Sequence, residues 1–138
     1  MFTKRKIGLI GLLLAAMSVS AYDFVAGDLA YSYVSQEDKT VEVSPMNYYE
    51  SGFVPADNYA NLVTCAIPAQ VTYNGVAYTV SGIAANAFNN AANLVSLSIP
   101  ATVTEIGATL PYGEASPLYN ANKLSTIVVD GKNPNYVS

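Results

Sequence analysis

The sequence predicts a β-rich solenoid, in which coils with parallel strands and short helical or 3-10 turns follow an antiparallel β-hairpin cap. Three observations predict it. An aliphatic pattern recurs three times from residue 62 onward, the preceding part of the chain alternates apolar and polar residues around turn signals, and a single cysteine excludes an intrachain disulfide. Apolar burial and hydrogen bonds between strands must therefore hold the fold together.

The repeated pattern is L-x-x-L-x-I. It occupies residues 94–99, with related copies at 62–67 and 124–129, at offsets of 32 and 30 residues. Ile83 and Ile106 begin successive units 23 residues apart, a period within the range of leucine-rich repeats. The last two apolar positions of each copy are two residues apart, so they share one face of a strand. Stacked coils with parallel strands would bury these side chains in a common interior.

The residues expected in this interior are the apolar side chains at repeat positions. They are Ile83, Phe88, Leu94, Leu97, Ile99, Val103, Ile106, Leu124, Ile127 and Val129, with Cys65 at the position of Leu97. We interpret Cys65 as a buried small hydrophobe, because a reactive thiol would need neighbouring cations. Residues 84–91 mix helix formers with Asn, which is typical of a short helical or 3-10 turn. Residues 110–117, rich in Pro and Gly, predict a loop inserted in the second coil.

The N-terminal part of the chain divides into an export signal and a cap. Residues 1–21 contain a basic start, an apolar stretch of 11 residues and small residues at the cleavage position, as a signal peptide does. The alternative is an uncleaved membrane anchor, but a bilayer requires about 20 apolar residues. Residues 22–82 are expected to form the antiparallel cap and lead-in, and residues 83–138 the coils. An Asn-Gly turn at 74–75 and a polar turn at 35–39 mark two hairpins.

Composition excludes several kinds of chemistry. The chain has no His and one Cys, so triads and His-containing zinc sites are excluded, and we expect no catalytic residue, cofactor or metal. A glycosidase-like carboxylate pair stays open as an alternative. Its candidates are Glu37, Asp38, Glu42, Glu50, Asp57, Glu105 and Glu114, which occur mostly singly. Removal of residues 1–21 takes away three of six basic residues and no acidic one, so the net charge falls from −4 to −7, which disfavours nucleic acid as a partner.

Eleven tyrosines are many for this length, and five lie in or beside predicted loops. These five are the candidate ligand face: Tyr48, Tyr49, Tyr59, Tyr112 and Tyr119. Tyrosine combines a large contact area with a polar tip, and it is enriched at interfaces. The tyrosines within predicted strands are interpreted as ordinary strand residues.

One stretch of the coils matches a known pattern. It is Ile83-x-x-x-Ala87-Phe88-x-x-Ala91-x-x-Leu94-x-x-Leu97-x-Ile99-Pro100-x-x-Val103-x-x-Ile106-Gly107. This stretch resembles the BspA-type leucine-rich repeat of large surface proteins in Bacteroides-like bacteria. The resemblance covers residues 60–138 well and 22–59 loosely. It departs at Ala91, where the family often has Cys, and at the inserted loop. The resemblance implies a cell-surface protein that binds host or bacterial partners.

We therefore expect an exported protein, located on the cell surface, on the outer-membrane face or secreted, that recognises an extracellular protein or glycan without catalysis. Its strand face and inserted loop would make the contact, and it would have no membrane span after signal removal. The alternatives are a structural cap or spacer of a larger surface protein, and an accessory domain of a carboxylate glycoside hydrolase. Because the chain stops where a further coil would begin, we also expect either a truncated product or self-association through the open C-terminal coil.

Overall fold

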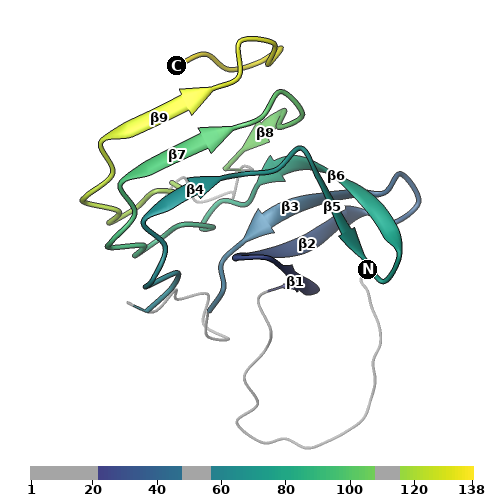
Figure 1. Cartoon of the computed structure of the whole chain (residues 1–138), viewed down its shortest axis with the longest axis horizontal. Coiled ribbons are helices and arrows are strands. Elements are labelled where there is room, and N and C mark those ends of the chain that lie inside the picture. The colour runs from purple at the N-terminus through teal and green to yellow at the C-terminus, as the bar shows by residue number, and fades with distance from the viewer. Residues whose placement is uncertain (1–21, 48–56, 108–115) are drawn as a thin grey trace, which may run out of the picture.

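The computed structural model describes residues 22–47, 57–107 and 116–138 (Figure 1). Over these ranges it contains nine strands and no helix. The predicted signal peptide, most of the predicted inserted loop and three candidate tyrosines, Tyr48, Tyr49 and Tyr112, lie outside the described residues. The predicted β-rich character is thus confirmed for the part of the chain that is described.

Three short strands form a parallel sheet. They are β4 (Thr64–Ala66), β7 (Ser96–Ile99) and β9 (Thr126–Val129), in the order β4-β7-β9. Cys65 lies opposite Leu97, and Leu97 lies opposite Ile127. These pairings reproduce the offsets of 32 and 30 residues in the sequence, so the prediction that the repeated segments lie side by side is confirmed. Figure 1 shows the three strands stacked in this order toward the C-terminus.

The other strands form a six-stranded mixed sheet in the order β1-β2-β3-β6-β5, with β8 also paired to β6. They are β1 (Phe24–Ala26), β2 (Leu29–Ser35), β3 (Thr40–Ser44), β5 (Gln70–Tyr73), β6 (Val76–Ile83) and β8 (Glu105–Ile106). Both predicted hairpins are present, as β2–β3 and β5–β6. Asn74 and Gly75 adopt φ angles of 50° and 78°, as a two-residue hairpin turn of type I′ requires.

The N-terminal half is not the purely antiparallel cap that the sequence predicts. β3 pairs with β6 in parallel, and β6 pairs with β8 in parallel. The reason is topological. The chain passes from β3 through β4 in the other sheet and returns as β5, and the β5–β6 hairpin then reverses it, so β6 runs in the same direction as β3. The predicted boundary between the cap and the coils lies between residues 82 and 83. Because β6 extends to Ile83, this boundary falls inside a strand, before its last residue, and does not separate two elements.

The segment expected to be a short helix consists of separate turns. Ala87 N donates to Ala84 O at 3.1 Å, and Ala91 N donates to Phe88 O at 3.0 Å, but no helix forms. Asn90 adopts a φ of 61°, the left-handed conformation. A left-handed residue cannot continue a right-handed 3-10 helix, so the chain changes direction at this point.

One apolar core lies between the two sheets. Most of the predicted core residues are buried in it: Cys65, Ile83, Phe88, Leu94, Leu97, Ile99 and Val103. Ile106, Leu124 and Val129 are partly buried against the same cluster. Ile127 departs from the prediction, with 41% of its surface exposed. It lies on β9, the last strand of the parallel sheet, and no described coil covers its outer side.

Aromatic side chains cover the core at the N-terminal end, where β1, β2 and β5 extend beyond β4 (Figure 1). Phe24 is 3% exposed, and its ring stacks on that of Tyr73 with centroids 4.3 Å apart. Tyr31 and Tyr78 also contact the Phe24 ring. Because aromatic rings bury large areas, this cluster shields the first coil from water.

Asparagine side chains connect successive turns of the chain. Asn58 is fully buried, and its Nδ2 donates to Ala87 O at 3.1 Å and to Asn89 O at 2.8 Å. Its Oδ1 accepts from Met46 N and Asn47 N. One amide side chain therefore satisfies four backbone groups, which would otherwise lose their hydrogen bonds in the interior.

Asn133 has the same role at the other end of the coils. Its Nδ2 donates to Pro100 O at 2.9 Å and to Val103 O at 2.8 Å. Its Oδ1 accepts from Asn135 N and Tyr136 N. The tail is thereby anchored to the preceding coil, although no aliphatic pattern in the tail predicts it.

We expect Leu97→Ala to lower the free energy of unfolding by about 2–5 kcal/mol, because it leaves a cavity in the central strand of the parallel sheet. Urea unfolding monitored by circular dichroism measures the change. Leu97→Met should cost less than about 1.5 kcal/mol, because it nearly conserves volume. Ser98→Ala, on the exposed side of the same strand, should change stability by no more than about 0.5 kcal/mol. Equal losses for Leu97→Ala and Ser98→Ala would contradict this account of the core.

Replacing Asn58 by Ala should destabilise the protein by about 2–4 kcal/mol, because it leaves buried backbone donors and acceptors without partners. Asn61→Ala is the matched control, since Asn61 is exposed three residues away. Thermal unfolding of both variants measures the difference. A loss for Asn58→Ala no greater than that for Asn61→Ala would show that the bridging hydrogen bonds contribute nothing.

Candidate functional site

The solvent-facing side of β4-β7-β9 is the strand face, defined here by two rows of side chains. The first row is Thr64, Ser96 and Thr126, and the second is Ala66, Ser98 and Val128. Within each row the residues are paired in register, and five of the six are exposed, Ser96 being half-buried. Side chains alternate along a strand, so the inward positions between the rows carry the core residues Cys65, Leu97 and Ile127.

The strand face is uncharged, because none of its six residues has a titratable side chain. Its short side chains stand about 4.8 Å apart from strand to strand, the ordinary spacing of a sheet. Hydroxyl groups can donate and accept hydrogen bonds, and the adjoining Val63 and Val95, 51% and 38% exposed, add apolar surface. Such a surface suits contact with another molecule, but it offers no group that could transfer a proton.

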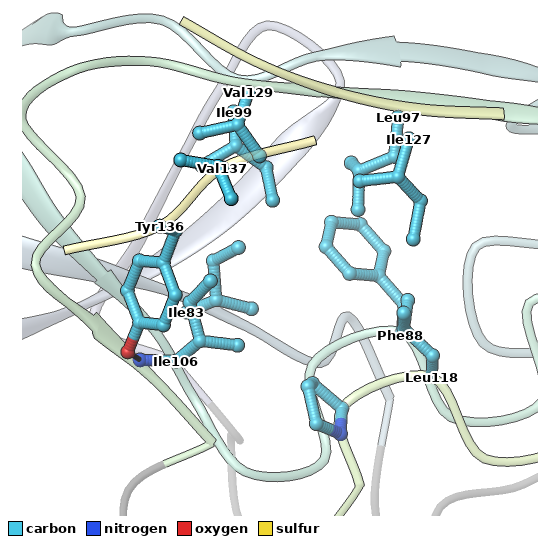
Figure 2. A pocket seen from close by; sticks show the side chains of 11 residues that line it. Ile83, Phe88, Leu97, Ile99, Ile106, Leu118, Ile127, Val129, Tyr136 and Val137 are labelled. Atoms are coloured by element: carbon cyan, nitrogen blue, oxygen red, sulfur yellow. Dashed lines mark hydrogen bonds between the residues drawn. The ribbon is translucent and has the colours of Figure 1, made fainter. Parts of the chain in front are cut away.

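An apolar hollow lies at the C-terminal end of the parallel sheet (Figure 2). Its volume is about 180 Å³, comparable to cavities that hold a small aromatic molecule. The lining side chains visible in Figure 2 are almost entirely aliphatic or aromatic and include Phe88, Leu97 and Ile127. Tyr136 contributes the one side-chain hydroxyl, which accepts a hydrogen bond from Ile106 N at 3.1 Å. The hollow could hold a hydrocarbon group, and its lining contains no carboxylate, lysine or histidine.

Tyr59 does not belong to a ligand face, contrary to the prediction. It is 6% exposed, and its hydroxyl accepts from Ala30 N at 2.9 Å and donates to Ser44 O at 2.7 Å. Burial raises the pKa of this hydroxyl well above its ordinary value. The side chain thus joins β2 and β3 to the first coil. Tyr119, by contrast, is 65% exposed on the turn before Leu124.

The candidate carboxylates within the described residues are distributed over separate elements. Glu37 and Asp38 lie exposed in the β2–β3 turn, and Asp57 and Glu105 are exposed elsewhere. Glu42 is largely buried against Gly82, and burial raises the pKa of its carboxyl. Glu50 and Glu114 lie outside the described residues. Among the residues that the structure describes, no group of three acidic, Cys or His side chains could hold a metal ion.

Cys65 is buried, with 4% of its surface exposed, and it has no disulfide partner. Burial, with a smaller contribution from the Asp28 carboxylate, raises the pKa of the thiol from 9.0 to about 12. The thiol is therefore protonated at neutral pH and is a poor nucleophile.

The chain matches no family model and no curated protein at a significant level. It is similar to solved structures, among them a leucine-rich repeat protein from Bacteroides ovatus ATCC 8483. That structure is 30% identical, with a TM-score of 0.59, over 80% of this chain and 24% of that one. Another is a leucine-rich cell surface protein from Faecalibacterium prausnitzii A2-165, 27% identical with a TM-score of 0.54, over 90% of this chain and 27% of that one.

These likenesses support a leucine-rich-repeat family for the chain. The repeat period of the sequence and the parallel pairing of β4, β7 and β9 agree with it. The chain spans about a quarter of the length of each of these two proteins. In the described ranges there is no helix of the length and hydrophobicity that a membrane crossing requires.

Cys65 should resist labelling by Ellman's reagent at pH 8 in the folded protein and react fully in urea, because its thiol is buried and protonated. Its folded pKa of about 12 exceeds the ordinary value of 9.0, so its contribution to stability is complete below pH 9 and is lost as the pH rises toward 12. Cys65→Ala should remove the part of the alkaline loss that the thiol causes, while the part caused by the buried hydroxyls of Tyr31 and Tyr59 remains. Rapid labelling of the native protein would show that the site opens.

Proposed function

We propose that the chain is a BspA-type leucine-rich-repeat module, exported to the bacterial surface, that recognises an extracellular protein or glycan through its strand face and performs no catalysis. The strand face carries the proposal. It is an uninterrupted, uncharged surface across three strands in register, and it contains hydroxyl groups but no titratable side chain.

The arrangement of both sheets supports the solenoid that the sequence predicts. β4, β7 and β9 are parallel neighbours, and β3, β6 and β8 are parallel neighbours in the other sheet. Each pass of the chain therefore supplies one strand to each sheet, as stacked coils do. The surface location is supported by the similar protein from Faecalibacterium prausnitzii, which is a cell surface protein.

The size of the strand face bears on the affinity that it could provide. A stable interface usually buries about 800 Å² on each partner, and three short strands expose less than a full interface of this kind. A longer array of coils would extend the same face, and repeated contacts would raise the overall avidity. The small hydroxyl-bearing side chains lose little conformational entropy on binding, so a flat partner could be contacted at low cost.

Thr126→Arg tests this proposal, because it places a long charged side chain on the strand face and leaves the backbone pairing with β7 intact. Purified chain without the signal peptide would be screened against immobilised extracellular-matrix proteins and a glycan array. We expect a binder in this panel and a loss of affinity of at least about tenfold in the variant, equivalent to about 1.4 kcal/mol.

Gln36→Arg is the matched control, because it adds the same charge in the exposed β2–β3 turn, away from the strand face. It should bind as the unmodified chain does. Both variants should unfold within about 0.5 kcal/mol of the parent, as surface substitutions usually do. Undiminished binding by Thr126→Arg would exclude the strand face, and a panel with no binder would favour a structural spacer without a ligand.

A further inference from the structure

A groove borders the outer edge of β4 and continues along the turn that precedes this strand. It consists of two adjoining hollows of about 220 and 310 Å³, both of which are lined by Asp28 and Leu62. The β1–β2 turn forms one wall, and β4 with the preceding turn forms the other. Figure 1 shows β4 as the strand of the parallel sheet that lies on the side of β1 and β2.

The backbone of β4 presents hydrogen-bonding groups toward this groove. Val63 O accepts from Val95 N at 2.7 Å, and Ile67 N donates to Ser98 O at 3.0 Å, so alternate residues pair with β7. The intervening residues, Thr64 and Ala66, direct their N–H and C=O groups to the other side, because amides alternate along a strand. β4 is the terminal strand of its sheet, and both residues line the groove.

The opposite edge of the sheet differs. On β9, the Ser138 hydroxyl accepts a hydrogen bond from Val129 N at 2.7 Å and lies 3.4 Å from Val129 O. The tail thus occupies part of that edge. The outward-facing residues of the two edges also border different surfaces: Thr64 and Ala66 on β4 line the groove, whereas Ile127 and Val129 on β9 line the apolar hollow.

The groove is acidic. Asp28 borders both hollows, and Asp57 borders the larger one. After residue 21 the chain has three basic residues, Lys39, Lys123 and Lys132, and none of them lines either hollow. The two carboxylates therefore face the groove without a neighbouring cation, on a chain whose charge beyond residue 21 is −7. A positively charged occupant would be attracted, and an acidic one repelled.

We propose that this groove binds an extended segment of a partner protein that carries Lys or Arg, which adds as a strand to the free edge of β4. The added strand would exchange backbone hydrogen bonds with Thr64 and Ala66, and its cations would lie beside Asp28 and Asp57. Strand addition of this kind draws affinity from the main chain and specificity from alternate side chains. The groove shares Thr64 and Ala66 with the strand face. It would use their outward backbone groups and the carboxylates of Asp28 and Asp57, not the rows of exposed side chains, so this inference does not rest on the proposed function.

The test uses fluorescently labelled octapeptides with alternating Lys and Thr, titrated with the purified chain without its signal peptide and followed by anisotropy. We expect saturable binding, with Asp28→Asn and Asp57→Asn each weakening it about two- to fivefold and the double variant weakening it further. Glu37→Gln removes an equal charge from an exposed turn and should leave the affinity unchanged. A peptide that is N-methylated at the alternate amides facing β4 should bind with an affinity at least about tenfold lower, which is roughly the effect of one or two lost hydrogen bonds.

Three results would overturn the proposal. The first is no saturable binding at a peptide concentration of about 1 mM, which corresponds to a weak binding free energy of about −4 kcal/mol. The second is equal binding of a Glu-Thr octapeptide, and the third is an unchanged affinity of the N-methylated peptide. The last would indicate electrostatic attraction without strand addition. Thr126→Arg lies two strands from β4 and should retain peptide binding. The double Asp variant should retain the strand-face partner, so failure of one proposal is distinguishable from failure of the other.

Discussion

Parallel pairing between segments about 30 residues apart is the constraint on which the rest of the structure depends. Parallel neighbours cannot be joined by a tight turn, so the chain must travel through the opposite sheet before it returns. Each pass therefore leaves a strand in both sheets, as β4, β7 and β9 do in one and β3, β6 and β8 do in the other. The aliphatic residues that face inward from both sheets then form one core.

The two ends of the apolar core between the sheets differ. At the N-terminal end, the ring of Phe24 contacts tyrosine rings of β2, β5 and β6, and these rings cover the core. At the C-terminal end, Ile127 is 41% exposed and the apolar hollow opens beside it. The turns between are held by polar bridges, since Asn58 and Asn133 satisfy backbone groups of the adjacent turn.

The two proposed surfaces follow from the same geometry. Alternation along each strand places hydroxyl-bearing side chains outward on β4, β7 and β9, and the register aligns them in rows. Ending the sheet at β4 leaves backbone groups without a strand partner, and the β1–β2 turn encloses them in an acidic groove. One surface is neutral and broad, whereas the other is narrow and negatively charged, so they suit partners of different chemistry.

The sequence by itself determined the elements whose signals are local or periodic. The Asn74-Gly75 turn, the hairpin of β2 and β3, the repeated strands and the inward positions such as Leu97 follow from backbone preferences and alternating side chains. The outward positions of the strand face follow from the same alternation, so this part of the candidate site was predictable.

Only the tertiary structure decided features that depend on how distant segments meet. No local pattern distinguishes Tyr59, which is buried between two strands, from the exposed Tyr119, or the buried Asn58 from the exposed Asn61. The parallel pairing of β3 with β6, the exposure of Ile127 and the acidic groove beside β4 likewise arise from the arrangement of the two sheets. Burial is a property of the neighbours that a residue acquires in space, and those neighbours are set by the pairing of strands that lie far apart in the sequence.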